Sequence, residues 1–461
     1  MNNLGLLEVE NGEIQAGIAN LLLAQERARE AGTVRPRSYI NIGYAYELLN
    51  EKQKAIQSYD KALELARKVS DREIEANALN NLGDSRYLLG DWETALRDFQ
   101  QALDLNRSLN NRRNEARTLN NLGAVYVRLE RFEEAELALE HARQLSYEAQ
   151  DGETETRALT NKAELLIRQK RPAEAIEVGR LAVSRASGFW AAEADARQIL
   201  GVAYREQGDL KRAREELERA ASLAKSRGDI NREAYCRLGL ARTDRKGGDL
   251  QTALSRVRSA TDMIESVRAG VVNPELRAMF LASKQDYYEF QIDTLMALHA
   301  AHPQKGFAAE ALEVSEQARA RSLLEILQES EADIREGVPP ALLEKERRLR
   351  REVNAMEGRR LELLGRKEAD AKALAEAEKR LERAREEYSK VQDELRSSSP
   401  RYGALTQPSP VTVSEIREQL LDGRALLLEY KLGKDRSFLW AVSPGSMESF
   451  ELPGREEIEW L

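Results

Sequence analysis

Asn80-Asn81-Leu82-Gly83 and Asn120-Asn121-Leu122-Gly123 are the same four residues forty positions apart, and Asn2-Asn3-Leu4-Gly5 shows them a third time. A small residue recurs at the place of this glycine at steps of 38 or 40 residues, as Gly5, Gly43, Gly83, Gly123, Ala163, Gly201 and Ala241. We name these the marker positions. A fixed period of this length indicates a repeat architecture, in which each unit buries its apolar face against the next.

Each repeat unit is predicted to be a pair of helices. A turn signal follows the marker by seven residues, as in Gly90-Asp91 and Gly208-Asp209. Large apolar residues stand sixteen positions after the marker, as Tyr59, Phe99 and Leu139. A small residue where two helices cross lets them approach closely, so we expect a side chain larger than Ala at the marker to force the helices apart.

These residues resemble the tetratricopeptide repeat, which has Gly or Ala at the marker, an aromatic residue three positions later, and Ala around a large residue in the second helix. The resemblance covers residues 2–270 and departs from the pattern at Lys162 and Gly179. It implies a mainly α fold, a tetratricopeptide-type α-solenoid wound as a right-handed superhelix, whose first helices line a concave groove that binds a partner polypeptide. The alternative interpretation is that the array is only a spacer.

Asn recurs two positions before the marker in five consecutive units, as Asn3, Asn41, Asn81, Asn121 and Asn161. Asn in a helix costs about 0.5 kcal/mol relative to Ala, so this recurrence asks for a reason. One interpretation is a row of amides that bind the backbone of an extended peptide, as Asn at this position does in similar tetratricopeptide proteins. The other is that the amides hydrogen-bond between adjacent helices and set the superhelical pitch; both can hold.

Arginines share the face of these asparagines in the middle of the array, at Arg117, Arg157, Arg128 and Arg168. Because guanidinium groups pair with carboxylates, an acidic, extended peptide is the implied ligand, although Glu164 on the same face weakens the pattern. The predicted partner-binding groove therefore consists of Asn41, Asn81, Asn121, Asn161, Arg117, Arg157, Arg128 and Arg168.

Composition argues against several other functions. The 71 Lys and Arg residues against 79 Asp and Glu give a net charge of -8, which disfavours nucleic-acid binding. No apolar run approaches the roughly 18 residues that cross a bilayer, and no signal peptide begins the chain, so we predict a soluble, cytoplasmic protein. The single cysteine, Cys236, suits a reducing compartment. His299 and His302, three residues apart on a helix, could share a metal, but Asp293 is the only apparent third ligand, so no metal or cofactor is expected.

Residues 1–270 are assigned to the repeats, and four further segments follow. Divergent helical repeats are predicted over 271–336. Apolar residues spaced by seven, and then by three and four, predict a charged antiparallel coiled-coil hairpin over 338–398. Residues 399–410 read as a linker. Within 411–461, Thr412 and Glu415 have capping-box spacing, and strands are predicted at 425–430, 437–442 and 449–452.

The order of these segments resembles bacterial proteins with a CHAT domain, a caspase-like α/β peptidase fold attached to tetratricopeptide repeats. Only residues 411–461 match the peptidase part, as its incomplete start. The family uses a His and a Cys at the ends of later strands, whereas here no His follows His302 and no Cys follows Cys236, so no catalytic residue is assigned.

The resemblance implies that the chain is a piece of a longer protein and is not itself an enzyme. Its repeats would sense or recruit substrate for a caspase-like cysteine peptidase. The alternative is a non-catalytic scaffold or adaptor protein.

Overall fold

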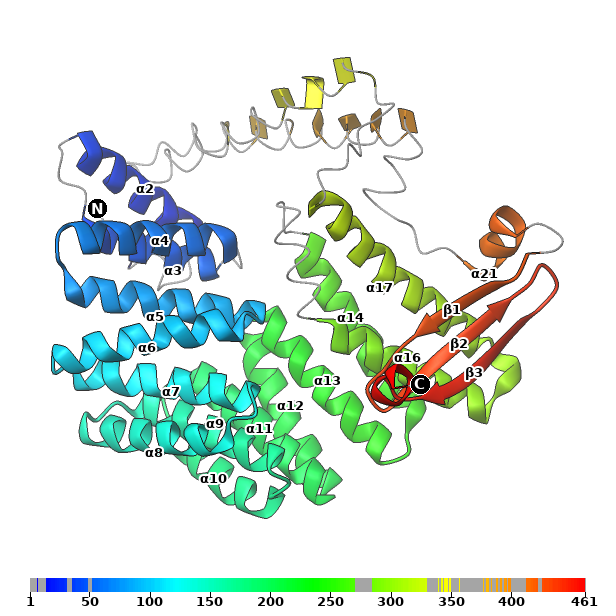
Figure 1. Cartoon of the computed structure of the whole chain (residues 1–461), viewed down its shortest axis with the longest axis horizontal. Coiled ribbons are helices and arrows are strands. Elements are labelled where there is room, and N and C mark those ends of the chain that lie inside the picture. The colour runs from blue at the N-terminus through cyan, green and yellow to red at the C-terminus, as the bar shows by residue number, and fades with distance from the viewer. Residues whose placement is uncertain are drawn as a thin grey trace. The chain divides into compact units, whose positions relative to one another are not determined.

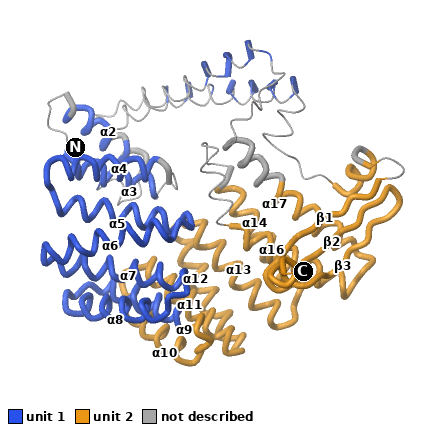
Figure 2. Tube along the Cα trace, viewed as in Figure 1, with its two compact units in different colours: residues 1–165, 333–406 blue, residues 166–332, 407–461 orange. Residues whose placement is uncertain are grey.

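The computed structural model describes residues 14–30, 35–48, 52–269, 284–329, 412–421 and 425–460, together with residue 6 and scattered positions between 339 and 398. The chain divides into two compact units, which Figure 2 colours separately. Unit 1 comprises residues 1–165 and 333–406, and unit 2 comprises residues 166–332 and 407–461. The division falls inside the predicted repeat array.

Unit 1 is built from helices that run as consecutive pairs (Figure 1). They are α2 (Ile14–Glu30), α3 (Pro36–Leu48), α4 (Lys52–Lys68), α5 (Arg72–Leu89), α6 (Trp92–Ser108), α7 (Arg112–Arg128), α8 (Phe132–Glu148) and α9 (Gly152–Arg168), the last of which ends in unit 2. We name α3, α5, α7 and α9, the first helices of their pairs, the A helices.

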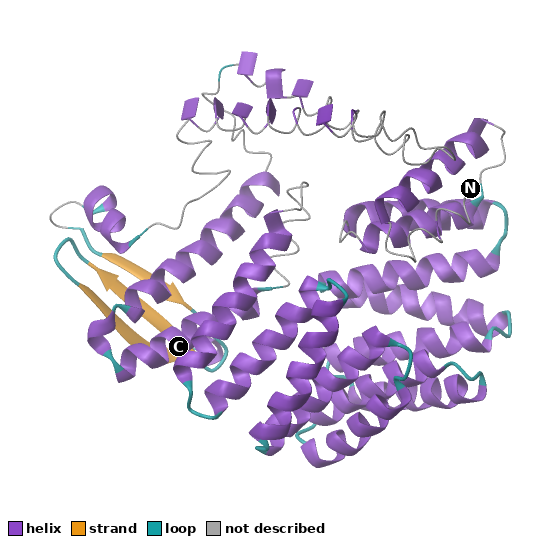
Figure 3. Ribbon diagram, turned by 180° about the vertical axis from the view of Figure 1, so that it is seen from behind, coloured by secondary structure: helices purple, strands orange, loops and turns teal. Residues whose placement is uncertain are grey.

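Unit 2 continues the helical pattern and ends in a small sheet (Figure 3). Its helices are α10 (Pro172–Arg185), α11 (Trp190–Gln207), α12 (Leu210–Ser226), α13 (Ile230–Lys246), α14 (Leu250–Ala269), α16 (Gln285–Ala301), η1 (Pro303–Lys305) and α17 (Phe307–Glu329). The elements of the C-terminal part are α21 (Val413–Glu415), η2 (Ile416–Leu420), β1 (Leu427–Lys431), β2 (Arg436–Val442), β3 (Met447–Pro453) and α22 (Arg455–Glu459). The predicted fold class, a tetratricopeptide-type solenoid with a few C-terminal strands, is confirmed.

The turn signals end one helix and start the next. Gly90 takes a φ of 86°, in the left-handed region that glycine tolerates, and caps the end of α5. Asp91 then accepts a hydrogen bond from the Thr94 N–H at 3.3 Å, which caps the start of α6. Asp209 does the same for α12 through the Arg212 N–H at 3.0 Å. The predicted turns at these positions are confirmed.

The marker glycines lie against the large residues sixteen positions later. A Cβ placed on Gly83 would come within 2.7 Å of the Phe99 ring, and one on Gly123 within 2.5 Å of Leu139. Gly43 and Tyr59 are equally close, at 2.4 Å. The crossing is therefore tighter than the sequence predicts, since even Ala would not fit at these glycines without a shift of the neighbouring side chain.

The three strands form an antiparallel sheet in the order β1-β2-β3. All three predicted strands are present, although β1 begins two residues later than predicted and β3 is longer at both ends. Phe438, Trp440 and Val442 of β2 are buried in one hydrophobic cluster with residues of α13, α14, α16 and α17. Thr412 forms the predicted capping box with Glu415 at the start of α21. One face of the sheet thus rests on the helices.

A buried carboxylate joins the sheet to α17. Glu429 of β1 is only 3% exposed, and the Arg319 guanidinium donates to its side chain and, at 3.3 Å, to the carbonyl of Tyr430. The pKa of Glu429 is raised to about 7. Burial is the largest cause, and the hydrogen bond with Glu316 and the negative charge of Glu316 follow. At neutral pH the site therefore holds a carboxyl group that titrates.

This carboxyl predicts a pH-dependent stability of unit 2. Because the pKa of Glu429 is raised on folding, the folded state binds more protons than the unfolded chain, and its stabilising contribution is complete below about pH 4.5 and lost as the pH rises through about 7. We expect the free energy of unfolding to fall by roughly 1 to 3 kcal/mol over this range. Denaturant titrations at several pH values should show a smaller slope in Glu429→Gln, and an unchanged slope would contradict the assignment.

Several predictions of the sequence fall on positions that are only partly described. In the segment predicted as a hairpin, Tyr388 donates to Glu346 at 3.0 Å and Lys345 pairs with Glu394 at 3.1 Å, so two stretches about 40 to 50 residues apart meet. Most of the other positions in 338–398, the linker 399–410, residues 270–283 and the first repeat marker, Gly5, lie outside the described residues. No helix in the described ranges is long and apolar enough to span a membrane.

Candidate protein-interaction site

The four predicted asparagines occupy the same position on the four A helices. Asn41 lies on α3, Asn81 on α5, Asn121 on α7 and Asn161 on α9, and all four are half-buried. We name them the amide row. The helical repeat places them in register, because a period of 40 residues returns each side chain to the same face of the next A helix.

Polar side chains of α5 and α7 bond to each other along the amide row. The Asn121 amide donates to Asp84 Oδ1 at 2.8 Å and, more weakly, to Asn80 Oδ1 at 3.4 Å. One turn earlier, the buried Thr118 hydroxyl donates to Asn80 Oδ1 at 3.1 Å, and Arg117 donates to Asn77 at 3.3 Å. The two helices are therefore joined by a polar seam as well as by apolar packing.

The seam continues from α7 to α9. Asn161 donates to Asn120 Oδ1 at 2.9 Å, and Asn120 donates to Asn121 Oδ1 at 3.2 Å. Arg128 pairs with Glu164 at 3.0 Å and also donates to Tyr87 on α5 at 3.1 Å. These are the bonds that the interhelical interpretation of the asparagines predicts. Peptide binding by the same amides stays a prediction.

The predicted arginines lie on a face of mixed charge. Arg117 and Arg128 bond across to neighbouring A helices, whereas Arg157 pairs with Glu153 of its own helix at 2.8 Å. Arg168 is exposed at the end of α9. Because Asp84 and Glu164 stand among them, the face offers guanidinium groups that are already hydrogen-bonded. An incoming carboxylate would have to replace these internal partners.

Sequence reasoning missed the acceptors of this seam. Asn80 and Asn120 are the first residues of the repeated Asn-Asn pair, and each accepts from the amide-row asparagine of the following A helix. Their recurrence at the same spacing is a sequence signal that could have identified them. Asp84 and Thr118 carry no comparable repeat, and only the packed helices place them here.

Asn81 differs from Asn121 in a way that permits a test. The Asn81 amide has no hydrogen-bond partner among the residues that the structure describes, although it is equally half-buried. We expect Asn121→Ala to lower the free energy of unfolding by about 1 to 2 kcal/mol, because Asp84 and Asn80 lose a donor, and Asn81→Ala to change it by less than about 0.5 kcal/mol. Denaturant unfolding of both variants measures the difference. Equal losses of stability in the two variants would mean that the hydrogen bonds of Asn121 in the seam do not stabilise unit 1.

No nucleophile is exposed at the only cysteine. Cys236 of α13 is fully buried, and burial, followed by the charge of Asp195, raises the pKa of its thiol to about 12. A thiol in this state is a poor nucleophile at neutral pH. In the described ranges no three His, Cys, Asp or Glu side chains come together as a metal site would require.

Two family models of the tetratricopeptide repeat match this chain, one at residues 36–68 and the other at residues 74–148 and 154–226. These ranges cover α3 and α7, all but the first two residues of α5 and α9, and the helices that follow each of them. The chain therefore carries tetratricopeptide repeats, a type of protein-interaction module. No curated protein matches it.

Several solved structures are similar at low sequence identity. Aspartyl phosphate phosphatase F from Bacillus subtilis is 17% identical, with a TM-score of 0.47 over 65% of this chain and 74% of that one. A Rap protein complexed with competence and sporulation factor is 13% identical, with a TM-score of 0.47 over 85% and 99%. The quorum sensor NprR from B. thuringiensis, in its apo form, is 21% identical, with a TM-score of 0.46 over 56% and 74%.

Proposed function

We propose that the amide-row face of the A helices binds an extended segment of a partner polypeptide. The observation that carries this proposal is the presence of an asparagine in the same register on four A helices, of which Asn81 keeps its amide without a partner among the described side chains. A primary amide offers both a donor and an acceptor, which matches the backbone of an extended peptide. The bound segment would run across successive A helices.

The proposed ligand carries acidic side chains. Arg157 is accessible on this face, and its pair with Glu153 lies at the surface, since the Glu153 side chain is 45% exposed. Exposed pairs of this kind contribute little, so a peptide carboxylate can replace Glu153 at small cost. Arg117 and Arg128 already bond to neighbouring A helices in the seam. They would attract an acidic peptide through their positive charge more than through direct hydrogen bonds to it.

A finer proposal assigns this module to substrate recruitment for a caspase-like cysteine peptidase. It rests on the resemblance of residues 411–461 to the start of a CHAT domain, whose catalytic His and Cys this chain does not supply. The rival is a non-catalytic scaffold or adaptor. Sequencing the gene beyond the codon for Leu461 discriminates them, because a His and a Cys at the ends of later strands support the peptidase and their absence supports the adaptor.

Peptide binding is tested with a display library of extended peptides panned on the full chain. Peptides rich in Asp and Glu are expected, with binding at least tenfold weaker in Asn81→Ala and in Arg157→Glu. Asn81→Ala is the informative variant because it leaves the seam intact, and thermal unfolding should confirm that its stability is unchanged. Selected acidic peptides that bind both variants as tightly as the native chain would refute the proposal.

A further inference from the structure

The two edges of the C-terminal sheet differ in how they are protected. On the β1 side, Arg319 of α17 donates to the carbonyl of Tyr430 at 3.3 Å. On the other side, β3 pairs only with β2 among the described residues. An unpaired edge of seven residues presents backbone donors and acceptors to any extended chain.

The register shows which residues of β3 face this open edge. Ser443 N–H donates to Ser446 O at 2.9 Å and closes the β2–β3 turn. Bonded and non-bonded pairs alternate along an antiparallel ladder, so Glu448 and Phe450, opposite Ala441 and Leu439, bond to β2. The backbone groups of Met447, Ser449 and Glu451 therefore point away from the sheet.

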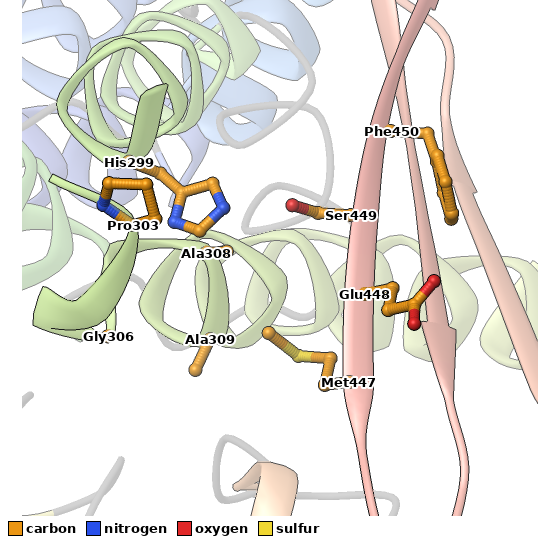
Figure 4. A pocket seen from close by; sticks show the side chains of 9 residues that line it. All are labelled: His299, Pro303, Gly306, Ala308, Ala309, Met447, Glu448, Ser449 and Phe450. Atoms are coloured by element: carbon orange, nitrogen blue, oxygen red, sulfur yellow. The ribbon is translucent and has the colours of Figure 1, made fainter. Parts of the chain in front are cut away.

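A cavity of about 390 Å³ adjoins this edge (Figure 4). It is lined by His299 of α16, by Pro303, Gly306, Ala308 and Ala309 around the start of α17, and by residues 447–450 of β3. Figure 4 shows Met447 and Ser449 on the helix-facing side of β3, with Glu448 and Phe450 on the other. The helical layer thus reaches past β3, where no described strand covers it.

The lining defines what the cavity would accept. Pro303, Ala308, Ala309 and Met447 are apolar, and most are small. His299 Nδ1 is buried and has no hydrogen-bond partner in the described part of the chain. A medium-sized apolar side chain fits the volume.

The geometry points to a second polypeptide-binding site, at which an extended partner segment pairs with β3 and inserts an apolar side chain, such as Leu or Met, into the cavity. Strand addition of this kind takes affinity from main-chain bonds and specificity from pockets that receive alternate side chains. Glu448 is exposed along the strand, whereas Glu451 already pairs with Arg436 at 3.3 Å, so a basic residue of the partner is favoured near Glu448. This site shares no residue with the amide row and does not depend on it.

The test uses the same display library on the full chain and compares three variants. Ser449→Pro removes an outward N–H without breaking a bond to β2, because proline is tolerated on an edge strand in that orientation. It should weaken binding of the selected Leu- or Met-containing peptides by about tenfold or more, whereas Ser449→Ala should keep it within about twofold. Ala309→Leu, which fills the cavity, should shift selection toward peptides with Gly or Ala at the inserted position.

Hydrogen exchange of β2 shows whether the sheet stays folded in Ser449→Pro. If the sheet unfolds in that variant, the peptides selected by Ala309→Leu alone test the proposal. Two outcomes overturn the proposal. One is that Ala309→Leu selects the same extended peptides as the native chain, or that no extended peptide binds. The other is that the native chain forms a dimer that Ser449→Pro dissolves, which would make a second copy the occupant of the edge. Asn81→Ala should leave this binding unchanged, so failure here is distinct from failure at the amide row.

Discussion

Gly83→Leu is expected to lower the free energy of unfolding of unit 1 by about 3 kcal/mol. A Cβ alone at this position would lie 2.7 to 2.8 Å from three atoms of the Phe99 ring, which is itself only 1% exposed. Leu adds further carbons in the same direction, so α5 and α6 must separate. Denaturant unfolding followed by far-ultraviolet circular dichroism measures the loss.

The same contact predicts a rescue. In the double variant Gly83→Leu/Phe99→Ala, the new side chain fills part of the space that the ring leaves. The double variant should therefore lose at least about 1 kcal/mol less stability than the sum of the losses in the two single variants. Gly445→Ala serves as the control, because a Cβ there meets nothing within 4 Å. Additive losses at Gly83 and Phe99 would show that the tight crossing is not the cause.

Trp440→Ala should remove about 3 to 5 kcal/mol of stability from unit 2. The Trp440 side chain is 0% exposed and stands between Phe438 and Val442 in the cluster that joins β2 to α13, α14, α16 and α17. Truncation leaves a cavity at this junction, and the sheet should lose protection against hydrogen exchange before the repeats do. Mass-spectrometric exchange of peptides covering residues 425–460 locates the effect.

Trp460→Ala is the matched control for this variant. The Trp460 side chain is 89% exposed, so its removal should change the free energy of unfolding by less than about 0.5 kcal/mol. If both tryptophan variants retained the exchange pattern of the native chain, the sheet would not depend on the β2 core for its attachment.

The helices and their turns could be predicted because their signals are local. Asp91 and Asp209 cap helices through N–H groups three residues away, and Gly90 ends a helix through its own φ. The strands were also predictable, but their ends were not, because pairing with β2 extends β3 to Met447 and Pro453. A residue can enter a strand through its partner even when its own side chain gives no signal.

The candidate site was predicted in its position and only partly in its chemistry. The sequence placed Asn121 and Arg128 on one face, but the structure shows that Asp84, Asn80 and Glu164 already bond to them. Lys162, a departure from the repeat pattern, pairs with Glu140 of α8 at 2.8 Å and so remains compatible with the fold. Comparing α5 with α7 is what shows that the Asn81 amide, unlike that of Asn121, has no hydrogen-bond partner among the described residues.

The repeat alone determined that this chain forms paired helices with a small residue at each crossing, because backbone capping and side-chain volume act over a few residues and recur with the period. The tertiary structure decided which polar groups are used internally and which stay available. Arg319 and Glu429 are 110 residues apart, and the cavity beside β3 is lined from segments more than 130 residues apart. Hydrogen bonds and cavities depend on where atoms from distant segments meet, and no spacing along the chain encodes that meeting.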